Sequence, residues 1–148
     1  MANSTAMCTS FKGELLTGTH NFTPSTGNTF KAALYFTTGT LGAATTVYSA
    51  TNEVTNTSGT GYTAGGVTVT NANTPATSGT TAYWTPSASF SWSALTVTTA
   101  FDAVLIYNST SSNKAVSVHN FGSQTVTAGT FTLTMPTNDA TTGLLRIA

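Results

Sequence analysis

The stretch of sequence that decides the fold is FDAVLIYNS (101–109), TSSN (110–113) and KAVSVHNFG (114–122). Two runs rich in β-branched and aromatic residues flank a short segment of Ser, Thr and Asn. This pattern is typical of an antiparallel hairpin with a loop of about four or five residues. Successive side chains of a strand point to opposite faces, so Leu105 and Ile106 make both faces of the first run apolar. We therefore predict that the hairpin is covered on both sides, as in a sandwich.

Further strands are predicted on both sides of this hairpin. Alternating or β-branched runs occupy residues 29–37, 45–50, 67–71, 80–85, 87–92, 95–99, 124–127, 130–135 and 144–147. Turn residues separate these runs about every ten positions, which is typical of a sandwich or a jelly roll. We expect an all-β fold, a single jelly-roll-like β-sandwich of roughly eight to ten short antiparallel strands.

The N-terminal region is predicted to differ from the rest. Residues 1–10 are small and polar and are expected to form a flexible arm, followed by one β-sandwich domain over residues 11–148. A short helix is favoured from Thr9, with Thr9 or Ser10 as N-cap and Gly18 as the stop. A strand over residues 11–16 is the alternative. Residues 51–66 are rich in Gly, Asn and Thr, so we expect a long surface loop there.

The composition excludes several classes of partner. Only 5% of the 148 residues are charged, and four basic residues balance four acidic ones. Such a chain has no electrostatic field to attract nucleic acid or an anionic membrane. No apolar run is long enough to span a membrane, and residues 1–12 do not have the pattern of a signal peptide. We expect neither a nucleic-acid partner nor a membrane partner.

Threonine dominates the sequence, with 36 residues. Its branched Cβ favours strands, and its hydroxyl solvates the outer face of a sheet without a charge. Natural sheets protect their free edges with charged side chains, especially Lys, and this chain has few. The edges are therefore either short and bulged or covered by another chain, and we favour the second alternative.

No catalytic or metal-binding signature is present in the sequence. The four carboxylates are not spaced as an acid–base pair; they are Glu14, Glu53, Asp102 and Asp139. The two histidines, His20 and His119, are not in a spacing typical of a metal site. The single cysteine, Cys8, has no histidine partner that the sequence specifies. We expect no enzyme activity and no cofactor. Cys8 is predicted to be a buried apolar residue. Asp102 lies in a core strand and is predicted to bond to nearby Ser and Thr hydroxyls.

Four aromatic residues offer the best indication of ligand binding. A platform of aromatic side chains for a sugar could be formed by Tyr62, Tyr83, Trp84 and Trp92. Alternation along a strand places Tyr83 and Trp84 on opposite faces, so at least one of them belongs in the core. Core packing is the favoured interpretation of this group.

Several segments resemble a family of small capsid cement (decoration) proteins of tailed, short-tailed bacteriophages. They are AVLIYN…NKAVSVHNFG (103–122), GTFTL (129–133), GLLRIA (143–148), SFKGELLTGTHNF (10–22) and YSATNEV…GTGYTAGG (48–66). The resemblance covers most of residues 11–148. The chain departs from the family pattern in an extra NTS at 56–58 and in a longer SWSALTV stretch at 91–97. The family has no catalytic residues to transfer to this sequence.

The resemblance implies a function in the virion. It implies a jelly-roll-like sandwich on the capsid exterior, made in the cytoplasm of the host bacterium, that binds the major capsid protein and stabilises the shell. We expect a homo-oligomer, either a dimer or a trimer. The residues expected at the interface are Phe11, Leu15, Asn52, Glu53, Tyr62 and Arg146.

Two other functional classes are weighed against this one. A tail or fibre component would contact the host surface, possibly through carbohydrate, and would need an exposed aromatic cluster. A glycosidase would need two carboxylates roughly 5–10 Å apart in a cleft. With four acidic residues in the chain, the glycosidase is the weaker alternative.

Overall fold

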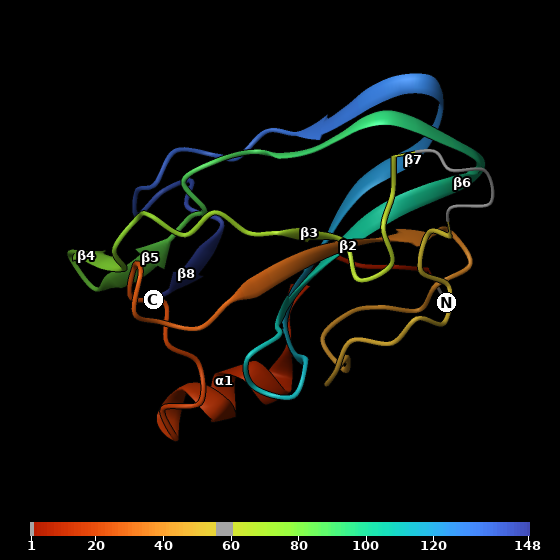
Figure 1. Cartoon of the computed structure of the whole chain (residues 1–148). Coiled ribbons are helices and arrows are strands. Elements are labelled where there is room, and N and C mark those ends of the chain that lie inside the picture. Colours follow the sequence, from red (N-terminus) through yellow and green to blue (C-terminus); the bar gives the residue numbers. More distant parts are fainter. Residues whose placement is uncertain (1, 56–60) are drawn as a thin grey trace.

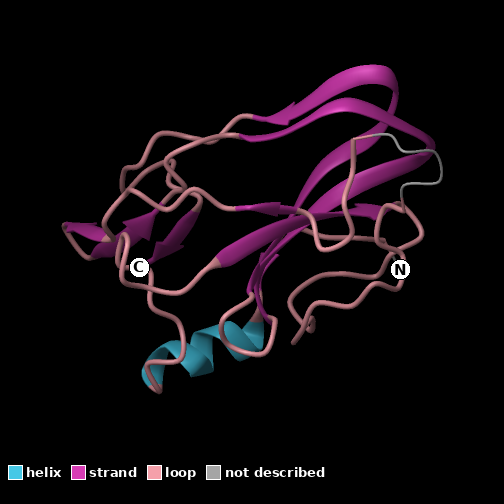
Figure 2. Ribbon diagram, in the orientation of Figure 1, coloured by secondary structure: helices cyan, strands magenta, loops and turns pink. Residues whose placement is uncertain are grey.

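The computed structural model describes residues 2–55 and 61–148 and contains two antiparallel sheets and one short helix (Figures 1 and 2). The elements are β1 (Ala6–Met7), α1 (Thr9–Leu16), β2 (Phe30–Phe36), β3 (Val67–Thr68), β4 (Ala76–Ser78), β5 (Thr81–Trp84), β6 (Phe90–Asn108), β7 (Lys114–Leu133) and β8 (Leu145–Ile147). One sheet has the order β1-β7-β6-β2-β3 and the other has the order β4-β5-β8. The predicted all-β sandwich is confirmed.

The predicted central hairpin is confirmed as the pairing of β6 with β7. Asn108 lies opposite Lys114, and residues 109–113 form the loop between them. Every residue from Phe101 to Asn108 is buried, so both faces of this segment are covered. Hydrophobic burial on two faces therefore fixes this part of β6 at the centre of the fold.

The eight strands of the described residues agree with the predicted number, but the prediction of short strands is wrong for β6, which has 19 residues, and for β7, which has 20. Their pairing contains several register shifts, and Ala94 and Ala128 have positive φ angles of 52° and 48°. These features are β-bulges, which bend a strand without ending its ladder of hydrogen bonds. Runs expected as separate strands are therefore segments of two long, curved strands (Figure 1).

The five-stranded sheet packs against the helix and the small sheet on one face. Phe30 of β2 stacks on Phe22 with ring centroids 4.3 Å apart, and it lies 6.2 Å from Trp84 of β5. Phe22 in turn contacts Phe11 of α1 at 6.0 Å. This aromatic cluster joins three elements, so the position of α1 relative to the small sheet depends on it.

Loop segments cover the opposite face of the same sheet. Tyr35 of β2 donates a hydrogen bond to the Ser49 carbonyl at 2.6 Å. Tyr107 of β6 donates one to the Gly65 carbonyl at 2.8 Å. Gly66 has a φ of 74°, and a Cβ there would lie 1.9 Å from the Ala32 carbonyl oxygen, so this close approach requires glycine. The predicted long loop, 51–66, thus lies along β2, although its residues 56–60 are outside the described part of the chain.

The N-terminal segment is attached to the sheet rather than extended as a free arm. β1 pairs with β7, Ala6 lying opposite Val118, and the Ser4 amide donates to the Leu41 carbonyl at 2.9 Å. The helix predicted over residues 9–16 is present, but its N-cap is Cys8, whose side chain makes no capping bond. The flexible arm predicted over residues 1–10 is corrected accordingly for residues 2–10.

Two short elements also differ from the prediction. Residues 45–50 form a single bridge, between Val47 and Lys114, in place of a strand. β4 lies in a segment expected to be a loop, and it exists because β5 provides a partner for it. Isolated runs of two or three residues contain too little pattern to be recognised from sequence.

The outermost strands β1, β3, β4 and β8 have two or three residues each. β1 pairs with only Ser117 and Val118 of β7, and β2 pairs with β6 only from Phe101 onward. The β6–β7 ribbon therefore extends beyond both of them with unpaired edges. Among these outermost strands, β8 lies beside α1 and lines a groove with it.

Candidate protein-binding groove

A groove runs between α1 and β8. Its volume is about 510 Å³, and it is lined by Met7, Lys12, Leu15, Leu16, Arg146, Ile147 and Ala148. A smaller apolar hollow of about 120 Å³ adjoins it beneath the helix, with Leu15 and Ile147 in both linings. We call the larger feature the α1–β8 groove.

Two large apolar side chains of the groove are exposed. Leu16 is 90% exposed and Ile147 is 47% exposed. Leu16 follows Leu15, which packs partly against the core one turn after Phe11, so the helix directs Leu16 to solvent. Each exposed side chain of this size gives up roughly 1.5–3 kcal/mol that full burial would recover. An apolar surface of this kind is suited to another protein chain.

The groove also contains a free strand edge. β8 pairs with β5 on one side, Tyr83 lying opposite Arg146, and it has no strand on its other side within the described residues. Its outward backbone groups can accept an added strand, which is a common mode of peptide recognition. The groove therefore offers both apolar side chains and backbone hydrogen-bonding groups.

Two basic side chains line the groove. Arg146 donates from Nη1 to the Thr141 carbonyl at 2.5 Å, which holds the guanidinium at the end of β8. The loop that carries Thr141 is closed by Asp139, which accepts from the backbone amides of Thr141 and Thr142 at 2.7 Å each. These bonds lower the pKa of the Asp139 carboxyl. Neither Lys12 nor Arg146 forms an ion pair with any described residue.

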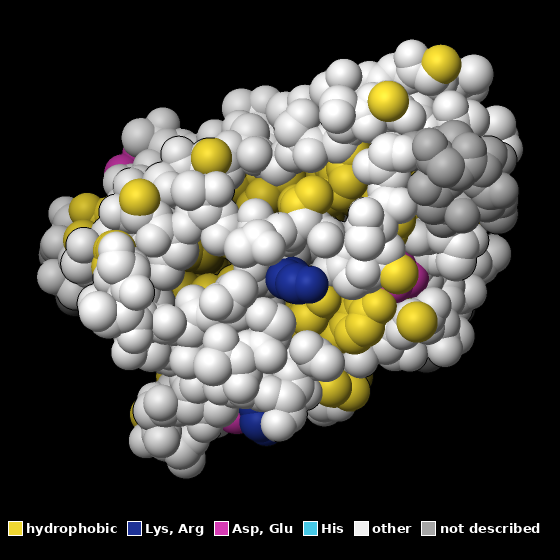
Figure 3. Space-filling view, viewed as in Figure 1, with side chains coloured by type: hydrophobic (Ala, Val, Ile, Leu, Met, Phe, Trp, Pro, Cys, Tyr) yellow, Lys and Arg dark blue, Asp and Glu magenta, His cyan; other side chains and the backbone are white. Residues whose placement is uncertain are grey.

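Charged side chains are rare elsewhere on the surface as well. Figure 3 shows one face of the molecule, on which charged side chains are few. The pair of basic residues at the α1–β8 groove is therefore a local exception in a chain with 5% charged residues.

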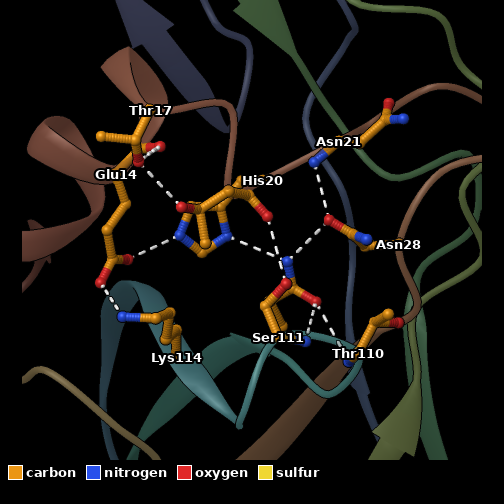
Figure 4. Close-up of polar contacts among 10 residues, drawn as sticks. Glu14, Thr17, His20, Asn21, Asn28, Thr110, Ser111 and Lys114 are labelled. Atoms are coloured by element: carbon orange, nitrogen blue, oxygen red, sulfur yellow. Dashed lines mark hydrogen bonds and ion pairs between the residues drawn. The ribbon is translucent and has the colours of Figure 1, made fainter.

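The two histidines have structural roles. The Nε2 atom of His20 lies 2.7 Å from Glu14, and its Nδ1 atom lies 3.1 Å from the Asn108 amide nitrogen (Figure 4). Lys114 bonds the other oxygen of Glu14 at 2.5 Å. Although burial raises the pKa of Glu14, hydrogen bonds from Lys114 and His20 outweigh it and lower that pKa. Both ring nitrogens of His20 are occupied, so neither is available as a base or a ligand.

His119 lies beside Ser117, with Nε2 2.9 Å from Oγ. Burial lowers the pKa of the imidazole from 6.5 to about 4. Because this folded-state pKa is below the unfolded one, the stabilisation is fully present above about pH 6.5 and is lost as the pH falls through about 4. We expect urea midpoints to fall over this range and to fall less steeply in H119Q, which keeps an acceptor for Ser117. Parallel pH profiles of the two proteins above pH 5 would contradict this assignment.

Asp102 bonds to amides rather than to the hydroxyls that we predicted. The Asn3 side-chain nitrogen donates to one carboxylate oxygen at 2.6 Å, and the Asn120 nitrogen donates to the other at 3.0 Å. The Asn120 nitrogen also bonds the Asn3 carbonyl at 3.0 Å. Asp102 thus attaches the N-terminal segment to β6 and β7.

Glu53 is the centre of a buried polar cluster. Its carboxylate accepts hydrogen bonds from the Tyr48 hydroxyl at 2.6 Å, the Tyr62 hydroxyl at 2.8 Å and the Gly65 amide at 2.6 Å. Burial, and secondly the charge of Glu53, raise the pKa of Tyr107 to about 12. Glu53 therefore holds residues 62–65 against the segment 48–53 and the sheet.

The six residues predicted at the interface fall into three groups. Leu15 and Arg146 line the α1–β8 groove, and Asn52 is exposed at a separate site. Phe11, Glu53 and Tyr62 are 1%, 2% and 3% exposed, so these three are interior residues and the prediction is corrected for them. Leu16, Ile147 and Lys12 were missed. The helical spacing after Phe11 was the available signal, because it places Leu15 toward the core and leaves Leu16 outside.

The remaining candidates are part of the interior. Cys8 is fully buried, as predicted, and burial raises its pKa to about 11, which leaves the thiol protonated and unreactive. Tyr62, Trp84 and Trp92 are also buried, which confirms core packing over an aromatic platform. Among residues 2–55 and 61–148 no cluster of three or more His, Cys, Asp or Glu side chains could hold a metal ion.

Comparisons with family models, curated proteins and solved structures find no significant match to this chain. Within the described residues, no helix has the length and apolar character needed to cross a membrane.

Proposed function

We propose that this protein is a capsid cement (decoration) protein of a tailed bacteriophage, which binds the outer surface of the major capsid protein shell and stabilises it. The observation that carries the proposal is the α1–β8 groove, where Leu16 and Ile147 are exposed beside a free strand edge. Such a combination suits attachment to another protein. The sequence resemblance described above supplies the identity of that protein, the capsid shell.

The composition supports the same proposal. Cement proteins cover a shell at high density, and a chain with four basic and four acidic residues does not repel its neighbours. Modest interfaces repeated over a whole shell add up to a large stabilisation. We propose that the chain lies on the virion exterior as a homo-oligomer, dimer or trimer.

The proposal predicts binding to empty shells of the phage that encodes the chain. We expect hundreds of copies per particle and a higher rupture temperature of the coated shell, measured by quantitative gel densitometry and calorimetry. The double variant Leu16→Ser, Ile147→Ser should bind at least about tenfold more weakly, because each side chain loses apolar burial.

Val47→Ser is the matched control for these variants, since Val47 is 46% exposed and does not line the groove. It should bind as the wild type does. A handful of copies per particle would instead identify a tail or fibre component. Wild-type protein that leaves both the shell and its rupture temperature unchanged contradicts the proposal directly.

A further inference from the structure

The electrostatics of the α1–β8 groove restrict what can occupy it. Lys12 and Arg146 are half of the four basic residues of the chain, and both line this one groove. Lys114, by contrast, is paired with Glu14. A partner that buries the groove must desolvate Lys12 and Arg146, and this is costly unless the partner brings opposite charge.

The carboxylate side chains of this chain already have hydrogen-bond partners within it, and Asp139 is also attracted by Arg146. Glu14 is held by Lys114 and His20, and Glu53 by two tyrosines and a backbone amide. Asp102 accepts from two asparagine amides. Asp139 is bonded to Thr141 and Thr142 within its own loop. These are all four Asp and Glu residues of the sequence.

A second copy of the chain is therefore a poor occupant. Two copies joined through β8 in a two-fold arrangement would bring two Lys12 side chains together, whereas each Arg146 already has the Asp139 carboxylate of its own chain nearby, whose pKa it helps to lower. Like charges brought together at an interface cost several kcal/mol. We therefore expect the carboxylate that pairs with Lys12 to come from a different polypeptide.

We propose that the α1–β8 groove binds an extended acidic segment of a different protein. The segment adds a strand to the free edge of β8, with apolar side chains on Leu16 and Ile147 and a carboxylate between Lys12 and Arg146. Arg146 and Ile147 are adjacent in β8 and point to opposite faces of the strand, so the acidic residue of the segment is adjacent to its apolar residues rather than two positions away. This inference rests on the proposed function for the identity of the partner, which is a shell component, and on the groove alone for its chemistry.

The test uses the full chain and a defined probe. The probe is a fluorescein-labelled peptide of sequence Thr-Thr-Val-Glu-Val-Thr-Thr, compared by anisotropy at low salt with peptides carrying Gln or Lys in place of Glu. We expect the Lys peptide to bind about tenfold more weakly than the Glu peptide, and the Gln peptide to be intermediate. Amide resonances of β8 should shift on binding of the Glu peptide.

Charge-reversed variants supply the specific test. In the double variant Lys12→Glu, Arg146→Glu the order of the peptides should reverse, so that the Lys peptide binds best. The single variant K12E should weaken binding of the Glu peptide, whereas K31E, with the same change in net charge at a residue outside the groove, should not. Equal effects of K12E and K31E would overturn the inference, as would failure of every peptide to bind the wild type.

The outcomes separate this inference from the proposed function. If the wild type coats shells but the charge-reversed double variant coats them equally well, the acidic-segment inference is wrong and the cement function stands. If the peptides behave as expected but shells are not bound, the groove chemistry stands and the cement function fails. A wild-type dimer that K12E dissociates would show that a second copy occupies the groove, and it too would overturn the inference.

Discussion

Replacing Phe30 by alanine is expected to lower the free energy of unfolding by about 3–5 kcal/mol. Phe30 is 1% exposed and stacks on Phe22 at 4.3 Å. Its removal leaves a cavity at the point where the large sheet, the helix and the small sheet meet. Because Phe22 also contacts Phe11 and Trp84, the loss propagates to the two elements that form the α1–β8 groove.

Urea unfolding followed by tryptophan fluorescence measures this change, since Trp84 belongs to the same cluster. Phe30→Leu, which keeps most of the volume, should cost much less than Phe30→Ala. Val47→Ala, at a side chain that is 46% exposed, should lie within about 0.5 kcal/mol of the wild type. A cost for Phe30→Ala no larger than that of Val47→Ala would mean that the cluster does not join the layers.

The core hairpin could be predicted because its signals are local. Alternation over residues 101–108 and 114–121, with a Ser/Thr/Asn segment between them, defines both strands and their loop within about twenty residues. The loop 109–113 contains Ser112 and Asn113 at positive φ angles of 52° and 57°, which suits the turn chemistry of that segment. Local pattern and tertiary structure agree here.

The length of β6 and β7 could not be predicted, because a bulge and a turn look alike in sequence. Ala94, Gly122 and Ala128 have positive φ angles and interrupt the alternation of apolar residues, as a turn does. In the structure the partner strand continues past each of them, so the ladder resumes on the far side. Only the pairing of β6 with β7 in the fold distinguishes a bulge from a turn.

The buried polar clusters were missed for a different reason. Asn3 and Asp102 are 99 positions apart, and no local pattern indicates that they meet. The small, polar composition of residues 1–10 predicts a free arm, yet the Asn3 amide donates to the buried Asp102 carboxylate, which burial would otherwise destabilise. Long-range polar pairing of this kind is decided by topology rather than by composition.

The candidate site was predictable in part. Leu15 and Arg146 are two of the six residues predicted at the interface, and both line the groove. The pairing of β8 with β5 places the C-terminal strand beside α1, and this depends on contacts between segments more than sixty residues apart in sequence. The exposure of Leu16 and Ile147 in one groove therefore became visible only with the fold.

Replacing Glu53 by alanine is expected to lower the free energy of unfolding by about 3–5 kcal/mol. The substitution leaves the Tyr62 hydroxyl and the Gly65 amide without the acceptor at 2.8 Å and 2.6 Å that they share. Buried donors of this kind lose their full hydration without compensation. Tyr48 is only half-buried and can bond to water, so Tyr48→Phe should cost about 1 kcal/mol.

Alkaline unfolding of a Glu53→Gln variant separates the effect of the Glu53 charge from the effect of its side-chain shape. The pKa of Tyr107 is raised from 10.0 to about 12, first by burial and then by Glu53. Because the folded-state pKa is the higher one, the stabilisation is fully present below about pH 10 and is lost as the pH rises through about 12. In Glu53→Gln the part of this shift that comes from charge disappears, so the phenolate absorbance of Tyr107 should develop at lower pH. A variant that unfolds and titrates as the wild type does would show that Glu53 does not hold residues 62–65 on the sheet.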